Sequence, residues 1–234
     1  MAAPMPAARP RVLIVGGSTE PSSAALVRSL ARGCDAVVAV DRGLDVLLEA
    51  GCGCDLFCGD ADSVSARGAA LVCAAEQRNA GGGAADSAPL VAAVERYDPH
   101  KDFTDLALAQ RAIRERWPHA ALACTCLAGG RPDHALAVIG RLLAWDGPVA
   151  LVEDAFDGRI LHAGDAWDIR DRAGARFTFI PLSPEAVVSE AGMRWELNRQ
   201  RVPLLSDLGI SNVVEAAQAT VAVHEGAVIA WCFR

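Results

Sequence analysis

The sequence predicts an α/β protein with two domains: a Rossmann-like domain built on a parallel sheet, followed by an all-β sandwich or jelly-roll domain. The first prediction rests on short, continuously apolar runs that alternate with segments of helical periodicity, a pattern typical of a parallel sheet covered on both faces. The second rests on a change after about residue 154, where segments become short and turn signals frequent. We therefore expect domains at residues 1–154 and 155–234.

The first domain is expected to alternate strands with helices. A typical strand is a run of Val, Leu, Ile and Ala, such as Arg11–Val15 before Gly16. A typical helix has apolar residues at helical spacing, such as Leu106, Ala109 and Ile113. The Gly- and Ala-rich stretch 79–87 is expected to be a flexible loop. The predicted strands are 11–15, 36–40, 55–58, 90–94, 121–127 and 149–153, and the predicted helices are 18–30, 44–50, 64–77, 103–116 and 134–145.

The second domain is expected to consist of strands alone. Turn signals such as Asp157-Gly158, Gly164-Asp165 and Glu225-Gly226 separate short apolar segments. Strands at this spacing are typical of a sandwich or jelly roll. The predicted strands are 159–162, 166–169, 176–181, 186–190, 219–224 and 228–233.

Composition argues against several classes of protein. The chain has 234 residues and a net charge of −7, whereas nucleic-acid binding requires a basic surface. No apolar run approaches the roughly 20 residues of a membrane span. Residues 1–11 are rich in Ala and Pro and do not follow the pattern of a secretory signal, so we expect a cytoplasmic location.

The eight cysteines are expected to be buried, reduced thiols. A chain this apolar does not need disulfides for stability. Cys52, Cys54 and Cys58 follow a C-x-C-x3-C spacing, which differs from the paired C-x2-C of zinc ribbons. A metal site at these cysteines is the less favoured alternative.

Polar residues cluster directly after the predicted strands. In an open parallel sheet, ligands bind beyond the carboxyl ends of the strands, so these residues are expected to converge on one edge of the sheet. Scattered surface charge would not follow that rule. The residues concerned are Asp41, Asp60, Asp62, Lys101, Asp102, Asp105, Arg131 and Asp133.

Asp60 and Asp62 lie two residues apart in the turn 59–63. Both carboxylates can point at one site, where a cation would relieve their repulsion, and Mg²⁺ prefers carboxylate, water and phosphate oxygens. The alternative is an acidic turn in which Asp62 or Ser63 caps the following helix.

The run 97–105 combines a lysine, carboxylates and a hydroxyl just before a helix. Lys101 matches a phosphoryl group, whose developing charge it would neutralise. Asp102 and Asp105 would hold a metal ion or orient the lysine. The alternative is that Asp102 or Thr104 caps the helix and that Lys101 is solvated.

The segment 129–134 opens a helix with two glycines. Glycines let the backbone approach a phosphate, and the N–H groups at a helix start favour an anion. Arg131 is a bidentate phosphate donor, and Asp133 could hold Arg131 in place or help deprotonate an alcohol. The alternative is a Gly-rich connection capped by Asp133.

Taken in order, these clusters resemble the motifs of the thiamine pyrophosphokinase (thiamine diphosphokinase) family. The resemblance covers nearly the whole chain, and its specificity comes from several modest motifs in the family's order. The first domain matches the family's Asp-bearing turn at residues 40–43, its G-D-x-D-S motif at 59–63, its K-D-x-T-D motif at 101–105 and its G-G-R-x-D-H motif at 129–134. The second domain resembles the family's I-P-L, G-L-K-[YW]-x-L and S-N segments at 180–183, 192–197 and 209–212.

The resemblance implies an enzyme that transfers pyrophosphate from ATP to the hydroxyl of thiamine and releases AMP. It implies a homodimer with sites near the subunit interface. It also implies Mg²⁺ held by Asp60 and Asp62 with help from Asp41 and Asp105, and thiamine contacts from Ser211 and Asn212. The implied catalytic residues are Asp60, Asp62, Lys101, Asp105, Arg131 and Asp133, and the implied nucleotide contacts are Asp41, Lys101, Asp102, Thr104, Gly129, Gly130, Arg131 and His134.

Three other functions fit parts of the sequence. A pyrophosphokinase for another alcohol, such as a hydroxymethylpterin, would use the same motifs of the first domain. A non-catalytic ATP- or thiamine-binding protein would not need all of the charged residues. A nicotinamide-dependent dehydrogenase is suggested only by Gly16-Gly17, which lacks the full G-x-G-x-x-G fingerprint.

Overall fold

The computed structural model describes residues 9–81, 89–97 and 103–234, and chain contacts divide the protein into two compact units. The first unit extends to Ala135, and the second runs from Leu136 to Arg234. Most of helix α5 (Pro132–Leu143) and all of strand β6 (Val149–Glu153) therefore belong to the second unit. The expected boundary after residue 154, which concerns functional domains, stays a prediction.

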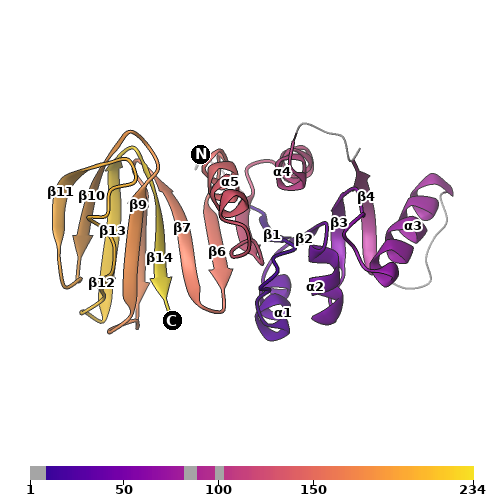
Figure 1. Cartoon of the computed structure of the whole chain (residues 1–234), viewed down its shortest axis with the longest axis horizontal. Helices are drawn as coiled ribbons and strands as arrows, with labels where there is room; N and C mark the ends of the chain where they lie inside the picture. The colour runs from indigo at the N-terminus through magenta and orange to yellow at the C-terminus, as the bar shows by residue number, and fades with distance from the viewer. Residues whose placement is uncertain (1–8, 82–88, 98–102) are drawn as a thin grey trace, which may run out of the picture. The chain divides into compact units, whose positions relative to one another are not determined.

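Within its described residues, the first unit is built on a parallel sheet of five strands in the order β5-β1-β2-β3-β4, of which Figure 1 labels β1 to β4. The inner strands are almost wholly buried, which agrees with their uninterrupted apolar sequences. Their carboxyl ends meet at one edge of the sheet. The strands are β1 (Arg11–Val15), β2 (Ala36–Val40), β3 (Cys54–Gly59), β4 (Val91–Arg96) and β5 (Ala121–Thr125).

Helices cover both faces of this sheet. The helices α1, α2 and α3 supply Val27, Leu47 and Val72 to a buried cluster with alternate strand residues such as Leu13 and Phe57. Helix α4 packs on β2 and β3 from the opposite face (Figure 1). The four helices are α1 (Ala24–Arg32), α2 (Gly43–Glu49), α3 (Ala66–Gly81) and α4 (Asp105–Arg116).

The second unit is a β-sandwich. Its described strands form two antiparallel sheets, in the orders β6-β7-β14-β9-β12 and β8-β13-β10-β11. Side chains from both sheets share one core, where Phe177 and Phe179 meet Val188 and Val221. The remaining strands are β7 (Phe156–His162), β8 (Ala166–Arg170), β9 (Arg176–Pro181), β10 (Glu185–Ala191), β11 (Leu197–Pro203), β12 (Asn212–Val213), β13 (Gln218–Glu225) and β14 (Ala227–Phe233).

The structure confirms the predicted fold class, and two differences from the predicted elements have local causes. Helix α1 begins at Ala24 and not near Ser18, because the side chain of Ser23 caps it by accepting the Leu26 N–H at 3.4 Å. Strand β11 was not predicted, because its central residues are polar and exposed.

The cysteines are free thiols. Cys54, Cys58, Cys124, Cys126 and Cys232 are buried as expected, whereas Cys34 and Cys52 are only half-buried and Cys73 is exposed. Burial raises the pKa of Cys54 and of Cys58 to about 12, so both remain protonated at neutral pH.

Across the described ranges, no helix combines the length and the apolar character that crossing a membrane would demand.

Candidate functional site

The loops after β5 and β1 are joined by hydrogen bonds at the carboxyl edge of the parallel sheet. The Gly16 N–H donates to the Thr125 carbonyl and the Ser18 N–H to the Cys126 carbonyl, both at 3.0 Å. The Ser18 hydroxyl donates to the Ala128 carbonyl at 2.5 Å. The turn after the first strand therefore lies directly against the segment that leads into 129–134.

Asp41 connects the ends of β2 and β3. Its N–H donates to the Cys58 carbonyl at 3.0 Å, and its backbone is left-handed with φ of 47°. Its carboxylate lies so close to Gly59 that a Cβ at Gly59 would collide with it. The absence of a side chain at position 59 thus permits a carboxylate to lie beside the first residue of the Asp60–Asp62 turn.

Asp60 and Asp62 form the expected tight turn. Asp60 Oδ1 accepts the Asp62 N–H at 3.0 Å, and Ala61 between them has φ of 64°. Arg96 donates to the Asp60 carbonyl at 3.2 Å and ties the turn to the end of β4. Asp60 is half-buried and Asp62 is exposed.

The cap of helix α3 is Ser65. The Ser65 hydroxyl accepts the Gly68 N–H at 3.1 Å, and its carbonyl accepts the Ala69 N–H at 2.8 Å. Neither Asp62 nor Ser63 therefore caps helix α3, and the alternative interpretation of the motif as a helix cap is wrong.

Thr104 and Asp105 begin helix α4. Thr104 caps it, with its hydroxyl accepting the Ala107 N–H at 3.3 Å. Burial is the main cause of the raised pKa of the Cys58 thiol, and the nearby charge of Asp105 adds to it, which puts Asp105 near the end of β3. Lys101 and Asp102 lie outside the described residues.

Gly129 and Gly130, which follow β5 in the chain, pack against the loop after β1. Both have positive φ, 85° and 71°, and a Cβ at either would approach Ser18, Thr19 or Glu20 at 3.3–3.5 Å. The two glycines bring the start of α5 onto the sheet edge. His134, in the first turn of α5, is exposed.

Arg131 and Asp133 form a bidentate pair at the start of α5. Arg131 Nε lies 3.1 Å from Asp133 Oδ1, and its terminal nitrogen lies 2.5 Å from Oδ2. The hydrogen bond from Arg131 lowers the pKa of Asp133 to about 2. A carboxylate of such low basicity is a poor proton acceptor, so the geometry favours Asp133 as the group that orients Arg131.

A cleft of about 390 Å³ lies beside these loops in the first unit. Arg42 and Arg67 bring two guanidinium groups to its wall, and the Cβ of Arg42 packs on Gly17. The carboxylates of Asp45 and Glu49 line the same cleft, so its walls carry both signs of charge. Neither arginine was among the predicted site residues. Arg42 belongs to the Asp-bearing turn 40–43 that resembles the family motif, whereas no sequence feature pointed to Arg67.

The acidic residues of this edge suit Mg²⁺ by chemistry but do not form a complete cage. No group of three or more His, Cys, Asp or Glu side chains within the described ranges is arranged to share a metal ion. Mg²⁺ commonly binds one or two protein carboxylates and completes its octahedron with water and substrate phosphates. Asp60 and Asp62, in one tight turn, are compatible with that requirement, and the metal roles of Asp41, Asp60, Asp62 and Asp105 all stay predictions.

The second unit has a pocket of its own, of about 350 Å³. Its walls combine one carboxyl, one amide and one indole with aliphatic side chains. Trp195, Leu208 and Ile210 are each about half exposed, at 59%, 53% and 48%, which is unusual for large apolar residues. The lining residues are Glu190, Trp195, Leu197, Leu208, Ile210 and Asn212.

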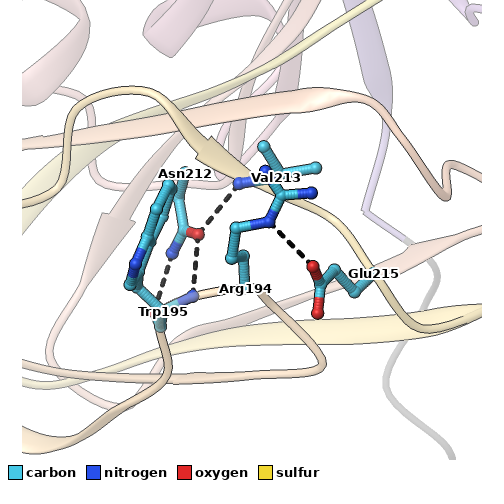
Figure 2. Close-up of polar contacts among 5 residues, drawn as sticks. All are labelled: Arg194, Trp195, Asn212, Val213 and Glu215. Atoms are coloured by element: carbon cyan, nitrogen blue, oxygen red, sulfur yellow. Dashed lines mark hydrogen bonds and ion pairs between the residues drawn. The ribbon is translucent and has the colours of Figure 1, made fainter.

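Asn212 is the polar centre of this pocket. Its Oδ1 accepts the backbone N–H of Trp195 at 3.1 Å and the backbone N–H of Val213 at 2.8 Å (Figure 2). Its Nδ2 donates to the Trp195 carbonyl at 2.8 Å and to Glu190 Oε2 at 3.0 Å. These four bonds use the hydrogen-bonding capacity of the amide, so Asn212 positions Trp195 and Glu190. Its direct contact with a substrate stays a prediction.

Ser211 precedes Asn212 in the chain but is exposed, whereas Asn212 is buried. Ser211 has φ of 62°, and its N–H donates to the Thr178 hydroxyl at 3.1 Å. The neighbouring Gly209 lies so close to Phe179 that a Cβ would meet the ring at 2.5 Å. The segment that carries Leu208 and Ile210 is thus held against β9.

Glu190 lines this pocket, and sequence reasoning did not single it out. It is only 2% exposed, and burial raises its pKa to about 7, although the Asn212 hydrogen bond lowers it. The period of two along β10 puts Ala186, Val188 and Glu190 on one face, and that face is the core. A carboxyl at a core-facing position of the strand pattern is the sequence feature that could have revealed Glu190.

Comparison with protein-family models gives two matches, one to each part of the chain. The model described as thiamin pyrophosphokinase, catalytic domain, matches residues 27–149. The model described as thiamin pyrophosphokinase, vitamin B1 binding domain, matches residues 168–228. The chain belongs to the thiamin pyrophosphokinase family. Among curated proteins, none matches this chain.

Solved structures of thiamin pyrophosphokinases share the fold. The enzyme from Bacillus subtilis is 24% identical, with a TM-score of 0.73 over 95% of this chain and 98% of its own. That from Geobacillus thermodenitrificans is 25% identical, with a TM-score of 0.73 over 96% and 97%. That from Candida albicans is 14% identical, with a TM-score of 0.74 over 97% and 90%. The fold of this family member is therefore kept at low sequence identity.

We predict that Asn212→Ala lowers the free energy of unfolding by about 2–4 kcal/mol, because it leaves buried partners of the amide without hydrogen bonds. Urea denaturation would measure the change. Ser211→Ala, at the adjacent exposed position, is the control and should stay within about 0.5 kcal/mol of the wild type. Equal stability of the two variants would contradict the role given to Asn212.

We also predict that stability depends on pH through Glu190. Its folded pKa of about 7 lies above the ordinary value of 4.5, so between these values the folded protein keeps a proton that the unfolded chain releases. The stabilisation is therefore present below about pH 4.5 and is lost as the pH rises through about 7. From pH 5 to pH 8, urea denaturation should show the wild type losing on the order of 2–3 kcal/mol relative to Glu190→Gln. Parallel pH profiles of the two proteins would contradict this.

Proposed function

We propose that this chain is a thiamine diphosphokinase, which transfers a pyrophosphoryl group from ATP to thiamine and yields thiamine diphosphate and AMP. The observation that carries this proposal is the presence, in one chain, of a catalytic and a vitamin B1 binding domain of the same family. The structure supports it with a cleft lined by Arg42 and Arg67 in one unit and, in the other, a pocket that combines apolar walls with one carboxyl and one amide.

The reaction exchanges one phosphorus–oxygen bond for another. The hydroxyl oxygen of thiamine forms a bond to the β-phosphorus of ATP, and the bond from that phosphorus to the oxygen shared with the α-phosphate breaks. AMP leaves with that oxygen, and the hydroxyl proton passes to water or a nearby base. Transfer of this kind depends on positioning and charge neutralisation, so the chain needs no covalent nucleophile.

The acidic residues are proposed to hold Mg²⁺. Asp60 and Asp62 would bind it, with help from Asp41 and Asp105. When bound, the ion neutralises phosphate charge. The hydrogen bond between Asp60 and the Asp62 N–H and the contact of Asp41 with Gly59 fix the backbone that carries these carboxylates. The chain's contribution is thus a preset arrangement of negative charge.

The basic residues are proposed to bind phosphate. Lys101 and Arg131 would stabilise the transferred group, with Arg131 oriented by Asp133. Arg42 and Arg67 of the adjacent cleft would add phosphate contacts. The other proposed nucleotide contacts are Asp41, Asp102, Thr104, Gly129, Gly130 and His134. Thr104 would act mainly by fixing the start of α4, since its hydroxyl caps that helix.

The sandwich is proposed to bind thiamine. Ser211, which is exposed, would contact it directly, and Asn212 would hold the pocket in shape. A homodimer with sites near the subunit interface, implied by the family resemblance, is part of the same proposal. The cytoplasmic location expected from the sequence stays a prediction.

The test is AMP release from ATP and Mg²⁺ with and without thiamine. The proposal expects AMP that depends on thiamine and matches the thiamine diphosphate formed. AMP released only with another alcohol, such as a hydroxymethylpterin, would assign a different acceptor. ATP binding without AMP from any acceptor would identify a binding protein and overturn the proposal.

We predict that Asp62→Asn lowers kcat about 100-fold or more, because it removes charge proposed to hold Mg²⁺. Thermal unfolding should be unchanged, since the contact of this residue with Asp60 uses its backbone N–H. Asp171→Asn, an exposed position with φ of 56° in the second unit, is the control and should keep full activity. Unaltered turnover of Asp62→Asn at saturating Mg²⁺ would remove Asp62 from the metal site.

A further inference from the structure

Glu190 lines the pocket of the sandwich and carries a buried carboxyl group. Its Oε2 accepts a hydrogen bond from Asn212 at 3.0 Å. Its Oε1 is shielded from solvent and has no hydrogen-bond partner among the residues that the structure describes. Burying such an oxygen without a partner is costly, so the chain keeps it at the expense of stability.

The position of this carboxyl is fixed from two sides. Its strand, β10, is an inner strand, where Glu190 pairs with Leu197 of β11 and Val221 of β13. The amide of Asn212 cannot be reversed, because its Oδ1 already accepts the N–H groups of Trp195 and Val213 (Figure 2). Its Nδ2 must therefore face Oε2, which leaves Oε1 as the carboxyl oxygen without a partner among the described residues.

The other walls of the pocket suit a flat heterocycle. Trp195 offers an indole ring, and Leu197, Leu208 and Ile210 offer aliphatic contacts. The Arg194 guanidinium lies 5.6 Å from the centre of the Trp195 ring and is paired with Glu215 at 2.8 Å, so the ring is supported from outside the pocket. An aromatic ring with one N–H donor would stack on the indole and pair with the carboxyl.

We propose that Glu190 determines acceptor specificity by accepting a hydrogen bond from the exocyclic amine of the aminopyrimidine ring of thiamine. This inference rests on the proposed function. The N–H donors of thiamine belong to that amine, since the thiazolium ring has none. The hydroxyl of thiamine must stay available for phosphoryl transfer and is not a suitable partner for a buried oxygen.

The test crosses two protein variants with two ligands. Wild type, Glu190→Gln and Glu190→Leu are each assayed for AMP release with thiamine and with oxythiamine, in which oxygen replaces the exocyclic amine. Binding of both ligands without ATP is measured by calorimetry. Glu185→Gln, an exposed residue of the same strand outside the pocket, is the matched control.

The expected result is specific to the amine. Wild type should prefer thiamine by at least about tenfold in kcat/KM, and Glu190→Leu should lose most of that preference through a higher KM for thiamine at nearly constant kcat. Glu190→Gln, which keeps an acceptor oxygen, should fall between the two. Glu185→Gln should match wild type. A merely structural role would affect both ligands equally, and that result would overturn the proposal.

Failure of the proposed function gives a different pattern. If wild type releases no AMP but binds thiamine, and this binding weakens about tenfold or more in Glu190→Leu, the role of Glu190 stands and the reaction is wrong. If wild type is active and Glu190→Leu keeps both its KM and its preference, the reaction stands and the role of Glu190 is wrong. Absence of both activity and thiamine binding would overturn both.

Discussion

Close backbone approach at the carboxyl edge of the parallel sheet is the constraint on which the first unit depends. The start of α2 lies so near β1 that a Cβ at Gly43 would collide with the Val15 carbonyl, and Gly59 has the same relation to the Asp41 carboxylate. These contacts bring successive strand ends together before any ligand arrives. Charged groups on different loops are thus carried by a rigid frame, which is what electrostatic catalysis of phosphoryl transfer requires.

In the second unit, a buried polar pair, Asn212 and Glu190, holds the walls of the pocket in place. Asn212 on β12 joins Glu190 on β10 to the loop that carries Trp195, so one amide fixes three separate segments. Because the surroundings are apolar, each of these bonds is expensive to break, and the network specifies one arrangement of the pocket. The carboxyl oxygen that remains is a cost to stability, and residues that carry such a cost are typical of binding sites.

The two units therefore divide the proposed chemistry by the kind of surface that each fold provides. A parallel sheet offers strand ends, helix starts and glycines, which suit phosphate and metal. A sandwich offers a stiff apolar wall with a few polar groups, which suits recognition of a heterocycle. The charge of Arg131 is oriented by Asp133 within one turn, whereas the carboxyl of Glu190 is oriented across strands.

The sequence by itself determined the fold class and the order of the polar clusters, because continuous apolar runs such as Arg11–Val15 specify buried parallel strands and the loops after them must share one edge. Only the tertiary structure decided that Ser65, and not Asp62, caps α3. It also decided that the Asn212 amide is hydrogen-bonded to neighbouring residues and that Glu190 is buried with one carboxyl oxygen unpaired among the described residues. It also revealed β11, whose exposed polar residues show no strand pattern. These features depend on hydrogen bonds between segments far apart in the chain, and the register that creates such bonds is not encoded in any local pattern.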